Sequence, residues 1–248
     1  MVRGGKVGPR SGGVNASPAG LDFAPRRPPG GPDETPRPRR ARTWNRNDGP
    51  QTDMMINPWH ELEPGLNPPT QMRAIVEIPR GSRNKYELDK KTGMFRLDRV
   101  LYSAVHYPGD YGFFPQTYAE DDDPLDALVM VTVPTFPGCE IDVRPVGLFR
   151  MKDRDEMDEK VLCVPCNDPL YDEFLDVGDV ASHFLKEVEH FFSVYKDLEG
   201  VRVTPLGWED AAAARAVITA SMARYALYMK QKQAESYAKV NVRKGLEL

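Results

Sequence analysis

The order of its strand-like and helix-like segments constrains the fold of this chain most strongly. Short runs rich in Val, Ile, Leu and Phe recur between residues 73 and 164, with turn residues between them. Apolar residues at helical spacing come later, in His183–Leu198 and Glu209–Lys232. Strands first and helices last favour an α+β domain, in which helices pack outside a small closed or nearly closed β-barrel.

Six segments are predicted to form strands. They are Arg73–Ile78, Lys85–Asp89, Met94–Leu101, Leu125–Val133, Asp142–Met151 and Lys160–Val164. Pro79–Ser82 and Thr92–Gly93 have the composition of turns. Alternation places Lys85 and Glu87 on the same face of their strand, and this polar face can point into a barrel cavity.

The composition divides the chain into three parts. Residues 1–55 are rich in Gly, Pro and Arg and lack sustained apolar periodicity, which predicts a disordered extension. Residues 56–232 form the predicted folded domain, and residues 233–248 form a polar tail. The extension has further interpretations: a transit peptide, an anion-binding arm, or sequence upstream of a start at Met54 or Met55. We expect a cytoplasmic protein, or an organellar one if the extension contains a transit peptide.

The charge distribution and the pattern of apolar residues each argue against one class of protein. The chain holds 33 Lys and Arg against 37 Asp and Glu, a net charge of −4. Residues 1–55 carry about +5, which leaves about −9 on the remainder. An acidic body lacks the basic surface that nucleic-acid phosphates require. The chain also lacks a run of about 18 or more apolar residues, so a membrane span is excluded.

The segment Asp121–Asp126 crowds carboxylates into a loop before a predicted strand. Asp121, Asp123 and Asp126 repel one another when ionised, and Pro124 helps to bend the loop. Protonation, solvent exposure or a cation relieves this repulsion, and hard divalent cations with oxygen ligands suit such a site. For the loop alone, a solvated acidic turn is the simpler interpretation.

A second acidic run, Asp153–Lys160, connects two predicted strands. Alone it is a charged hairpin. Two acidic clusters beside strand ends can, however, meet across a cavity. Shared carboxylates there would hold several metal ions, which is the arrangement of two-metal hydrolysis.

Basic and phenolic side chains are candidates for binding phosphate oxygens. They are Lys85, Arg99, Lys196, Tyr107, Tyr111 and Tyr195. Tyr195 lies on the apolar stripe of His183–Leu198, which can direct its hydroxyl toward the barrel with Lys196 beside it. Taken singly, each of these residues is more simply explained as surface charge or core packing.

Nine motifs that follow one another along the chain favour functional roles over these simpler explanations. They are Val76–Pro79, Lys85–Asp89, Asp98–Arg99, Tyr107–Gly112, the D-x-D-P-x-D signature at Asp121–Asp126, Arg144–Gly147, Val164–Pro165, His190–Phe192 and Tyr195–Leu198. From Asn57 to about Tyr228 the chain resembles the family I soluble inorganic pyrophosphatases. Asn57–His60 and Tyr102–His106 are most similar to prokaryotic-type members.

The resemblance implies a five-stranded, OB-like barrel with flanking C-terminal helices. It implies hydrolysis of pyrophosphate to two phosphates with several Mg²⁺ ions, and a homo-oligomer, of which a hexamer is favoured. It implies neither a nucleic-acid nor a membrane partner. The alternative is a catalytically silent family member that acts as a scaffold subunit, which would be expected to have lost ligands.

The family's functional residues transfer to matching positions of this chain. Metal binding is implied for the carboxylates Asp121, Asp126, Asp153, Asp158, Glu77 and Glu87. Phosphate binding is implied for Lys85, Arg99, Tyr111, Tyr195 and Lys196, of which Arg99, Tyr111 and Lys196 also count as catalytic. A hydroxide between two metal ions would be the nucleophile, with Asp123 as its general base. Tyr107 and Lys160 would support the cavity.

Two departures from the family pattern accompany this assignment. Asp122 stands where the signature commonly has Gly; aspartate tolerates left-handed backbone and adds negative charge. The run Asp153–Lys160 lacks the glycine usual in this hairpin, and Arg154 and Glu156 can alter metal affinity there. Neither departure removes a predicted ligand.

Overall fold

The computed structural model of this protein describes residues 56–245, with side chains as far as residue 236. Its strands are β1 (Met72–Ile78), β2 (Asn84–Leu88), β3 (Phe95–Val100), β4 (Asp110–Phe113), β5 (Asp126–Val129), β6 (Glu140–Asp153), β7 (Glu156–Pro165) and β8 (Val203–Glu209). Its helices are α1 (Pro58–Glu61), α2 (Ser182–Val194) and α3 (Ala211–Gly245), with 3-10 turns at Pro169–Tyr171, Val177–Asp179 and Asp197–Glu199. The predicted extension, residues 1–55, lies outside the described residues.

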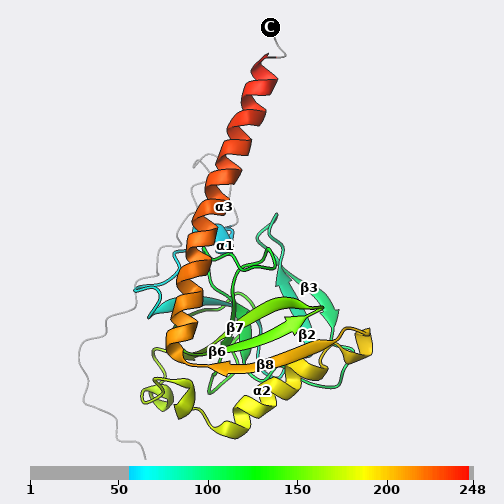
Figure 1. Ribbon diagram of the computed structural model, residues 1–248, viewed down its shortest axis with the longest axis vertical. Helices are drawn as coiled ribbons and strands as arrows, with labels where there is room; N and C mark the ends of the chain where they lie inside the picture. Colours follow the sequence, from blue (N-terminus) through cyan, green and yellow to red (C-terminus); the bar gives the residue numbers. More distant parts are fainter. Residues whose placement is uncertain (1–55, 246–248) are drawn as a thin grey trace, which may run out of the picture. The chain divides into compact units, whose positions relative to one another are not determined.

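Five strands pair in a ring. The sheet order is β1-β4-β5-β7-β6-β8, and β1 also pairs with β6, so the first five strands close on themselves. All neighbours are antiparallel except β5 and β7. β2 and β3 form a separate two-stranded sheet, and β8 continues the main sheet beyond β6 (Figure 1). The predicted OB-like α+β fold is confirmed.

Each of the six predicted strands is present, with shifted ends, and two strands escaped prediction. β4 holds only four residues, Asp110–Phe113, too few for a recognisable alternation. β8 contains Pro205 and Gly207, which are unusual in strand interiors. β8 lies at the edge of the sheet and pairs only with β6 among the described strands, so these residues are tolerated.

The predicted helix Glu209–Lys232 needs correction at both ends. Glu209 closes β8, and α3 begins at Ala211, where the Asp210 side chain accepts the Ala213 amide hydrogen at 2.8 Å and so caps the helix. At the other end α3 continues to Gly245, because residues 233–244 hold no Gly or Pro to end it. α3 therefore runs on past the strands (Figure 1).

The two long helices cover different parts of the barrel. In α2, Val188, Phe191 and Phe192 are buried in a core cluster with residues of β6 and β7. The helix is amphipathic as predicted, although it ends at Val194 and not at Leu198. In α3, Ala214 and Ile218 are buried in a second cluster with residues of β1, β5 and β7. Burial of these apolar faces fixes both helices on the sheet.

Two turns in the predicted acidic segments adopt left-handed backbone at residues other than glycine. Asp122 has φ +65°, the conformation that its substitution for glycine was expected to tolerate. Arg154 and Asp155 connect β6 to β7 with φ +51° and +70°. Positive φ at both central residues is typical of a type I′ hairpin turn, which sets Asp153 opposite Glu156 without a glycine.

Within residues 56–245, no helix combines the length and the apolar character that a membrane span needs.

Candidate active site

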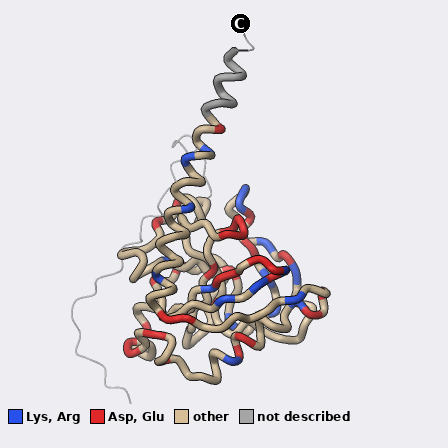
Figure 2. The backbone as a smooth tube through the Cα atoms, in the orientation of Figure 1, with Lys and Arg blue, Asp and Glu red and all other residues tan. Residues whose placement is uncertain are grey.

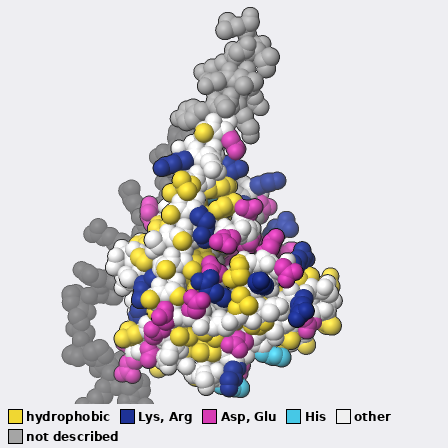
Figure 3. All heavy atoms as spheres, viewed as in Figure 1, with side chains coloured by type: hydrophobic (Ala, Val, Ile, Leu, Met, Phe, Trp, Pro, Cys, Tyr) yellow, Lys and Arg dark blue, Asp and Glu magenta, His cyan; other side chains and the backbone are white. Residues whose placement is uncertain are grey.

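One cavity of about 360 Å³ opens at the ends of several strands. β1 and β2 supply Glu77, Lys85 and Glu87. β4, the acidic loop and β5 supply Tyr111, Asp121, Asp123 and Asp126. The β6–β7 hairpin and the end of α2 supply Asp153, Asp158, Lys160, Tyr195 and Lys196. Acidic and basic segments interleave in this part of the fold (Figure 2), and both kinds of side chain are interspersed on the face shown in Figure 3. The structure thus gathers every predicted site residue except Arg99 and Tyr107.

Strand register sets the centre of the cavity. Asp126 begins β5 and lies beside Lys160 of the parallel strand β7. The Lys160 Nζ atom is 2.6 Å from Asp126 Oδ2 and 2.7 Å from Asp158 Oδ1. The Tyr111 hydroxyl donates a hydrogen bond to the same Asp126 oxygen. Lys160, which is 2% exposed, also lies over the rings of Tyr111 and Phe192.

Two carboxylates at this centre, Asp158 and Asp121, bind protons more strongly than isolated ones. Burial raises the pKa of Asp158, opposed by Lys160 and reinforced by Asp126. Burial also raises the pKa of Asp121, reinforced by Asp158. Burial opposes the charge of Lys160, but Asp126 and Asp158 outweigh it and raise its pKa well above the ordinary value. The cavity therefore favours added positive charge.

Glu77 is an acid of the cavity with a strongly raised pKa. Burial raises its pKa to about 8, with a smaller contribution in the same direction from Asp126. The Leu88 amide donates to Glu77 Oε1 at 2.7 Å, which partly offsets the cost of burying the charge. The β1 carboxylate is thereby held toward β2.

Two further lysines pair with carboxylates at the cavity wall. Lys85 Nζ donates to Glu87, so the two residues share the strand face on which they were predicted to lie. Lys196 Nζ donates to Asp153 Oδ2, while the buried Asp153 Oδ1 has no hydrogen-bond partner among the described residues. A buried acceptor without a partner is costly.

The donor set suits a hard divalent cation. All of the predicted ligands supply carboxylate oxygens. Burial, reinforced by a neighbouring carboxylate, raises the pKa of Asp121 and of Asp158, and Asp153 Oδ1 has no hydrogen-bond partner among the described residues. As placed, however, no three His, Cys, Asp or Glu side chains of the described residues already form a metal-binding group. Lys160 and Lys196 take the carboxylate oxygens instead.

Comparison with known proteins decides the family. The model of the family described as inorganic pyrophosphatase matches residues 74–226. The chain belongs to the inorganic pyrophosphatase family. An inorganic pyrophosphatase of Haloferax volcanii is 51% identical over 172 residues, which cover 69% of this chain and 97% of that protein. One of Methanosarcina acetivorans is 53% identical over 151 residues, covering 61% and 90%.

Solved structures agree with this family assignment. The crystal structure of the inorganic pyrophosphatase from Thermus thermophilus has a TM-score of 0.67 and 45% identity, and covers 68% of this chain and 99% of that one. The Helicobacter pylori inorganic pyrophosphatase has a TM-score of 0.64 and 38% identity, covering 66% and 98%. The similarity thus extends over nearly the whole of these bacterial pyrophosphatases.

Two predicted pyrophosphatase site residues do not line the cavity. Arg99 of β3 lies opposite Lys85 in register, but its Nε donates to Glu199 Oε1 at 3.1 Å. Tyr107 is buried, with its ring centroid 5.3 Å from that of Tyr111 and 4.8 Å from that of Phe191. Tyr107 therefore packs behind the cavity wall.

Lys90 is a cavity residue that sequence reasoning missed. It follows β2, and its Nζ donates to the Asp123 carboxylate and to the Asp122 carbonyl oxygen, the latter at 3.3 Å. It also lies 5.2 Å from the centroid of the Trp59 ring. The one sequence feature that could have indicated Lys90 as a site residue is its position next to the Lys85–Asp89 motif. The sequence does not show that the β2–β3 turn approaches the acidic loop.

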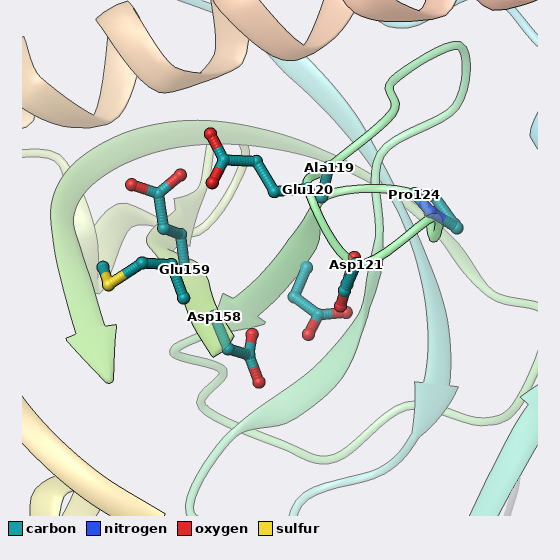
Figure 4. A pocket seen from close by; sticks show the side chains of 8 residues that line it. Ala119, Glu120, Asp121, Pro124, Asp158 and Glu159 are labelled. Atoms are coloured by element: carbon teal, nitrogen blue, oxygen red, sulfur yellow. The ribbon is translucent and has the colours of Figure 1, made fainter. Parts of the chain in front are cut away.

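A smaller pocket adjoins the cavity behind the acidic loop. It is lined by Ala119, Glu120, Asp121, Pro124, Asp126, Met157, Asp158 and Glu159. Figure 4 shows the side chains of Glu120 and Glu159 on one side of this pocket and those of Asp121 and Asp158 on the other. Residues 120–121 and Asp158–Glu159 of β7 therefore contribute two separate pairs of acidic side chains to this pocket.

Proposed function

We propose that this protein hydrolyses inorganic pyrophosphate to two phosphates. The observation that carries the proposal is the single cavity that combines Asp121–Asp126 and the β6–β7 carboxylates with lysines and tyrosines, in a chain of the inorganic pyrophosphatase family. A silent scaffold would be expected to lack part of this set. All of the predicted carboxylates, lysines and tyrosines are present.

The chain's own residues supply binding and proton transfer. Lys85 of β2 and Lys196 at the end of α2 would hold the oxygens of the two phosphoryl groups and stabilise the departing phosphate. The Tyr195 hydroxyl would donate to a phosphoryl oxygen, since burial raises its pKa and keeps it protonated. Asp123 would accept the proton of the attacking water. Arg99 would bind phosphate only after exchanging its Glu199 partner for the substrate.

Magnesium binding is proposed for the carboxylates on both sides of the cavity. Asp121, Asp126 and Asp158 would hold the tightest ion, and Glu77, Glu87 and Asp153 would hold further ions. Bound Mg²⁺ lowers the pKa of water and neutralises charge on the phosphate oxygens. Lys160 would stay between Asp126 and Asp158 and limit their mutual repulsion.

Phosphate release from pyrophosphate tests this function. The purified chain should release phosphate with Mg²⁺ and stop when a chelator is added. Asp123→Asn should lose at least about 100-fold in kcat and stay folded, because removal of a general base has effects of this order. Asp172→Asn, on an exposed turn residue, is the matched control. A wild-type chain that releases no phosphate would favour the silent scaffold.

The quaternary structure and chain organisation are also proposals. We infer a homohexamer from the similarity to prokaryotic-type members, and analytical ultracentrifugation would measure its mass. The domain boundaries at residues 55 and 232 and the cytoplasmic location stay predictions. Limited proteolysis would locate the first boundary.

A further inference from the structure

Aromatic rings from three parts of the chain stack beside the acidic loop. We define the aromatic cluster as Trp59 of α1, Tyr118 before the loop, and Tyr225 and Tyr228 of α3. The ring centroids of Tyr118 and Tyr228 are 4.7 Å apart with an interplanar angle of 19°, and those of Trp59 and Tyr118 are 6.3 Å apart at 12°. Tyr118 is thus stacked between α1 and α3.

The backbone of Tyr118 is fixed to α3. Its amide donates to the Ser221 carbonyl oxygen at 3.0 Å, and its own carbonyl oxygen accepts from Arg224 Nε at 2.8 Å. The preceding Thr117 is buried, and its carbonyl oxygen accepts from Trp59 Nε1 at 2.8 Å. The chain therefore enters the acidic loop from a point held by both helices.

The Tyr118 side chain connects this fixed point to the tip of the loop. The Tyr118 hydroxyl donates to Asp122 Oδ1 at 2.6 Å. Hydrogen bonding to Asp122 raises the pKa of Tyr118 to about 12, so the phenol remains the donor at neutral pH. Asp122 is the residue at which this chain departs from the common family signature, and glycine at this position would have no side-chain acceptor.

Lys90 also holds the loop. Lys90 donates to the Asp123 carboxylate while its ammonium lies over the Trp59 ring. Asp121 and Asp123, the two residues that flank Asp122, are the proposed metal ligand and general base. A contact at Asp122 therefore acts on the backbone that carries both of them, although Asp122 itself does not line the cavity.

We infer that Tyr118 and Asp122 are positioning residues that fasten the acidic loop to α3 and so place Asp121 and Asp123 for Mg²⁺ binding. The inference rests on the proposed function for its account of these two carboxylates. The alternative is a surface hydrogen bond that contributes only to stability, since both residues are partly or fully exposed. Binding of Mg²⁺ and a mutant cycle separate the two.

Tyr118→Phe removes the hydroxyl and keeps the stacked ring. Tyr102→Phe, on an exposed tyrosine that does not line the cavity, is the matched control. Isothermal titration with Mg²⁺ alone should show binding about fivefold weaker in Tyr118→Phe than in wild type, and unchanged in Tyr102→Phe. The melting temperature of both variants should stay within about 2 °C of wild type, because the lost hydrogen bond is solvent-exposed. Equal Mg²⁺ affinity in the two variants would overturn the inference.

Substitutions of Asp122 test the acceptor itself. Asp122→Asn and Asp122→Gly both remove the negative charge and both tolerate positive φ, but only asparagine keeps an oxygen acceptor. Mg²⁺ affinity should therefore be about fivefold higher in Asp122→Asn than in Asp122→Gly. The double variant Tyr118→Phe/Asp122→Gly should bind Mg²⁺ no more weakly than Asp122→Gly alone, since each substitution removes the same hydrogen bond. Additive losses would mean that the residues act independently.

Kinetics complete the test where the wild type is active. Tyr118→Phe should lower kcat about fivefold at limiting Mg²⁺, with the KM for magnesium pyrophosphate unchanged, because the loop does not supply the phosphate-binding lysines. A raised KM with normal kcat would contradict a role in placing Asp121 and Asp123. An inactive wild type would refute the proposed function, and the Mg²⁺ titrations would still decide on the positioning role.

Discussion

The ammonium group of Lys160 lies 2.6 Å from a carboxylate oxygen of Asp126, across two strands that run parallel. The remaining neighbours in the five-stranded ring run antiparallel. The parallel pair brings the end of the acidic loop beside the β6–β7 hairpin, so that two acidic segments far apart in sequence share one buried cation. The site is thus assembled by strand pairing and not by either segment alone.

The first prediction concerns this buried cation. Lys160→Met should lower the free energy of unfolding by about 3 kcal/mol in metal-free protein, because it leaves Asp126 and Asp158 facing each other without a positive charge. Added Mg²⁺ should recover part of the loss. Urea unfolding with chelator and with Mg²⁺ measures both effects. Lys152→Met on the exposed face of β6 is the control and should change stability by less than about 0.5 kcal/mol.

The second prediction concerns pH and Glu77. Burial raises the pKa of this acid to about 8, above its value in the unfolded chain, so the folded state retains a proton that the unfolded chain releases. The contribution of protonated Glu77 to the free energy of unfolding is fully present below about pH 4.5 and is lost as pH rises through about 8. Metal-free wild type should therefore lose up to about 4 kcal/mol relative to Glu77→Gln between these limits. Glutamine keeps an acceptor for the Leu88 amide.

Urea midpoints at a series of pH values measure this difference. The exposed variant Glu173→Gln should follow the wild-type curve. Saturating Mg²⁺ should remove the difference, because a metal ion favours the ionised acid. Parallel curves for wild type and Glu77→Gln in metal-free buffer would contradict the proposed burial effect.

Local patterns predicted much of the fold and of the site. Runs rich in Val, Ile, Leu and Phe located six of the eight described strands, and helical spacing located α2, because these signals come from neighbouring residues. The acidic loop stood out for the same reason: its carboxylates are adjacent in sequence. Only the ordered motifs, however, favoured a metal site over a solvated acidic turn as the interpretation of this loop.

Long-range relationships explain what the sequence did not reveal. The contact of Lys90 with the acidic loop depends on how the β2–β3 turn lies against residues 121–126. Arg99 faces Glu199, which is 100 residues away, and no local pattern announces that pair. The role of Asp122 likewise depends on α3, which begins about 90 residues later. Such contacts are set by tertiary packing.

The third prediction concerns the hairpin between β6 and β7. Asp155 has φ +70°, which costs a residue with a Cβ atom more than it costs glycine. Asp155→Gly should therefore raise the free energy of unfolding by about 0.5 kcal/mol, and Asp155→Ala should lower it by about 1 kcal/mol. Chemical denaturation of the three proteins at fixed Mg²⁺ gives the order. Equal stability of the alanine and glycine variants would mean that the turn relaxes out of the left-handed region.

The fourth prediction explains a glycine of the Tyr107–Gly112 motif. Gly112 of β4 lies opposite Val76 of β1, and a Cβ atom at this position would overlap the Ile75 carbonyl group. The overlap is with backbone, so no side-chain rotation relieves it, and β1 would have to move away from β4. Gly112→Ala should therefore cost at least about 3 kcal/mol, or prevent folding.

Gly178→Ala is the matched control, since a Cβ atom there meets no other atom within 4 Å. Its stability should stay within about 0.5 kcal/mol of wild type. Because Tyr111 and Asp126 both depend on β4 and β5 for their positions, any Gly112→Ala protein that does fold should bind Mg²⁺ more weakly than Gly178→Ala. Circular dichroism melting and Mg²⁺ titration of the two variants measure these effects. A Gly112→Ala protein with wild-type melting and Mg²⁺ affinity would show that β1 and β4 do not pack this closely.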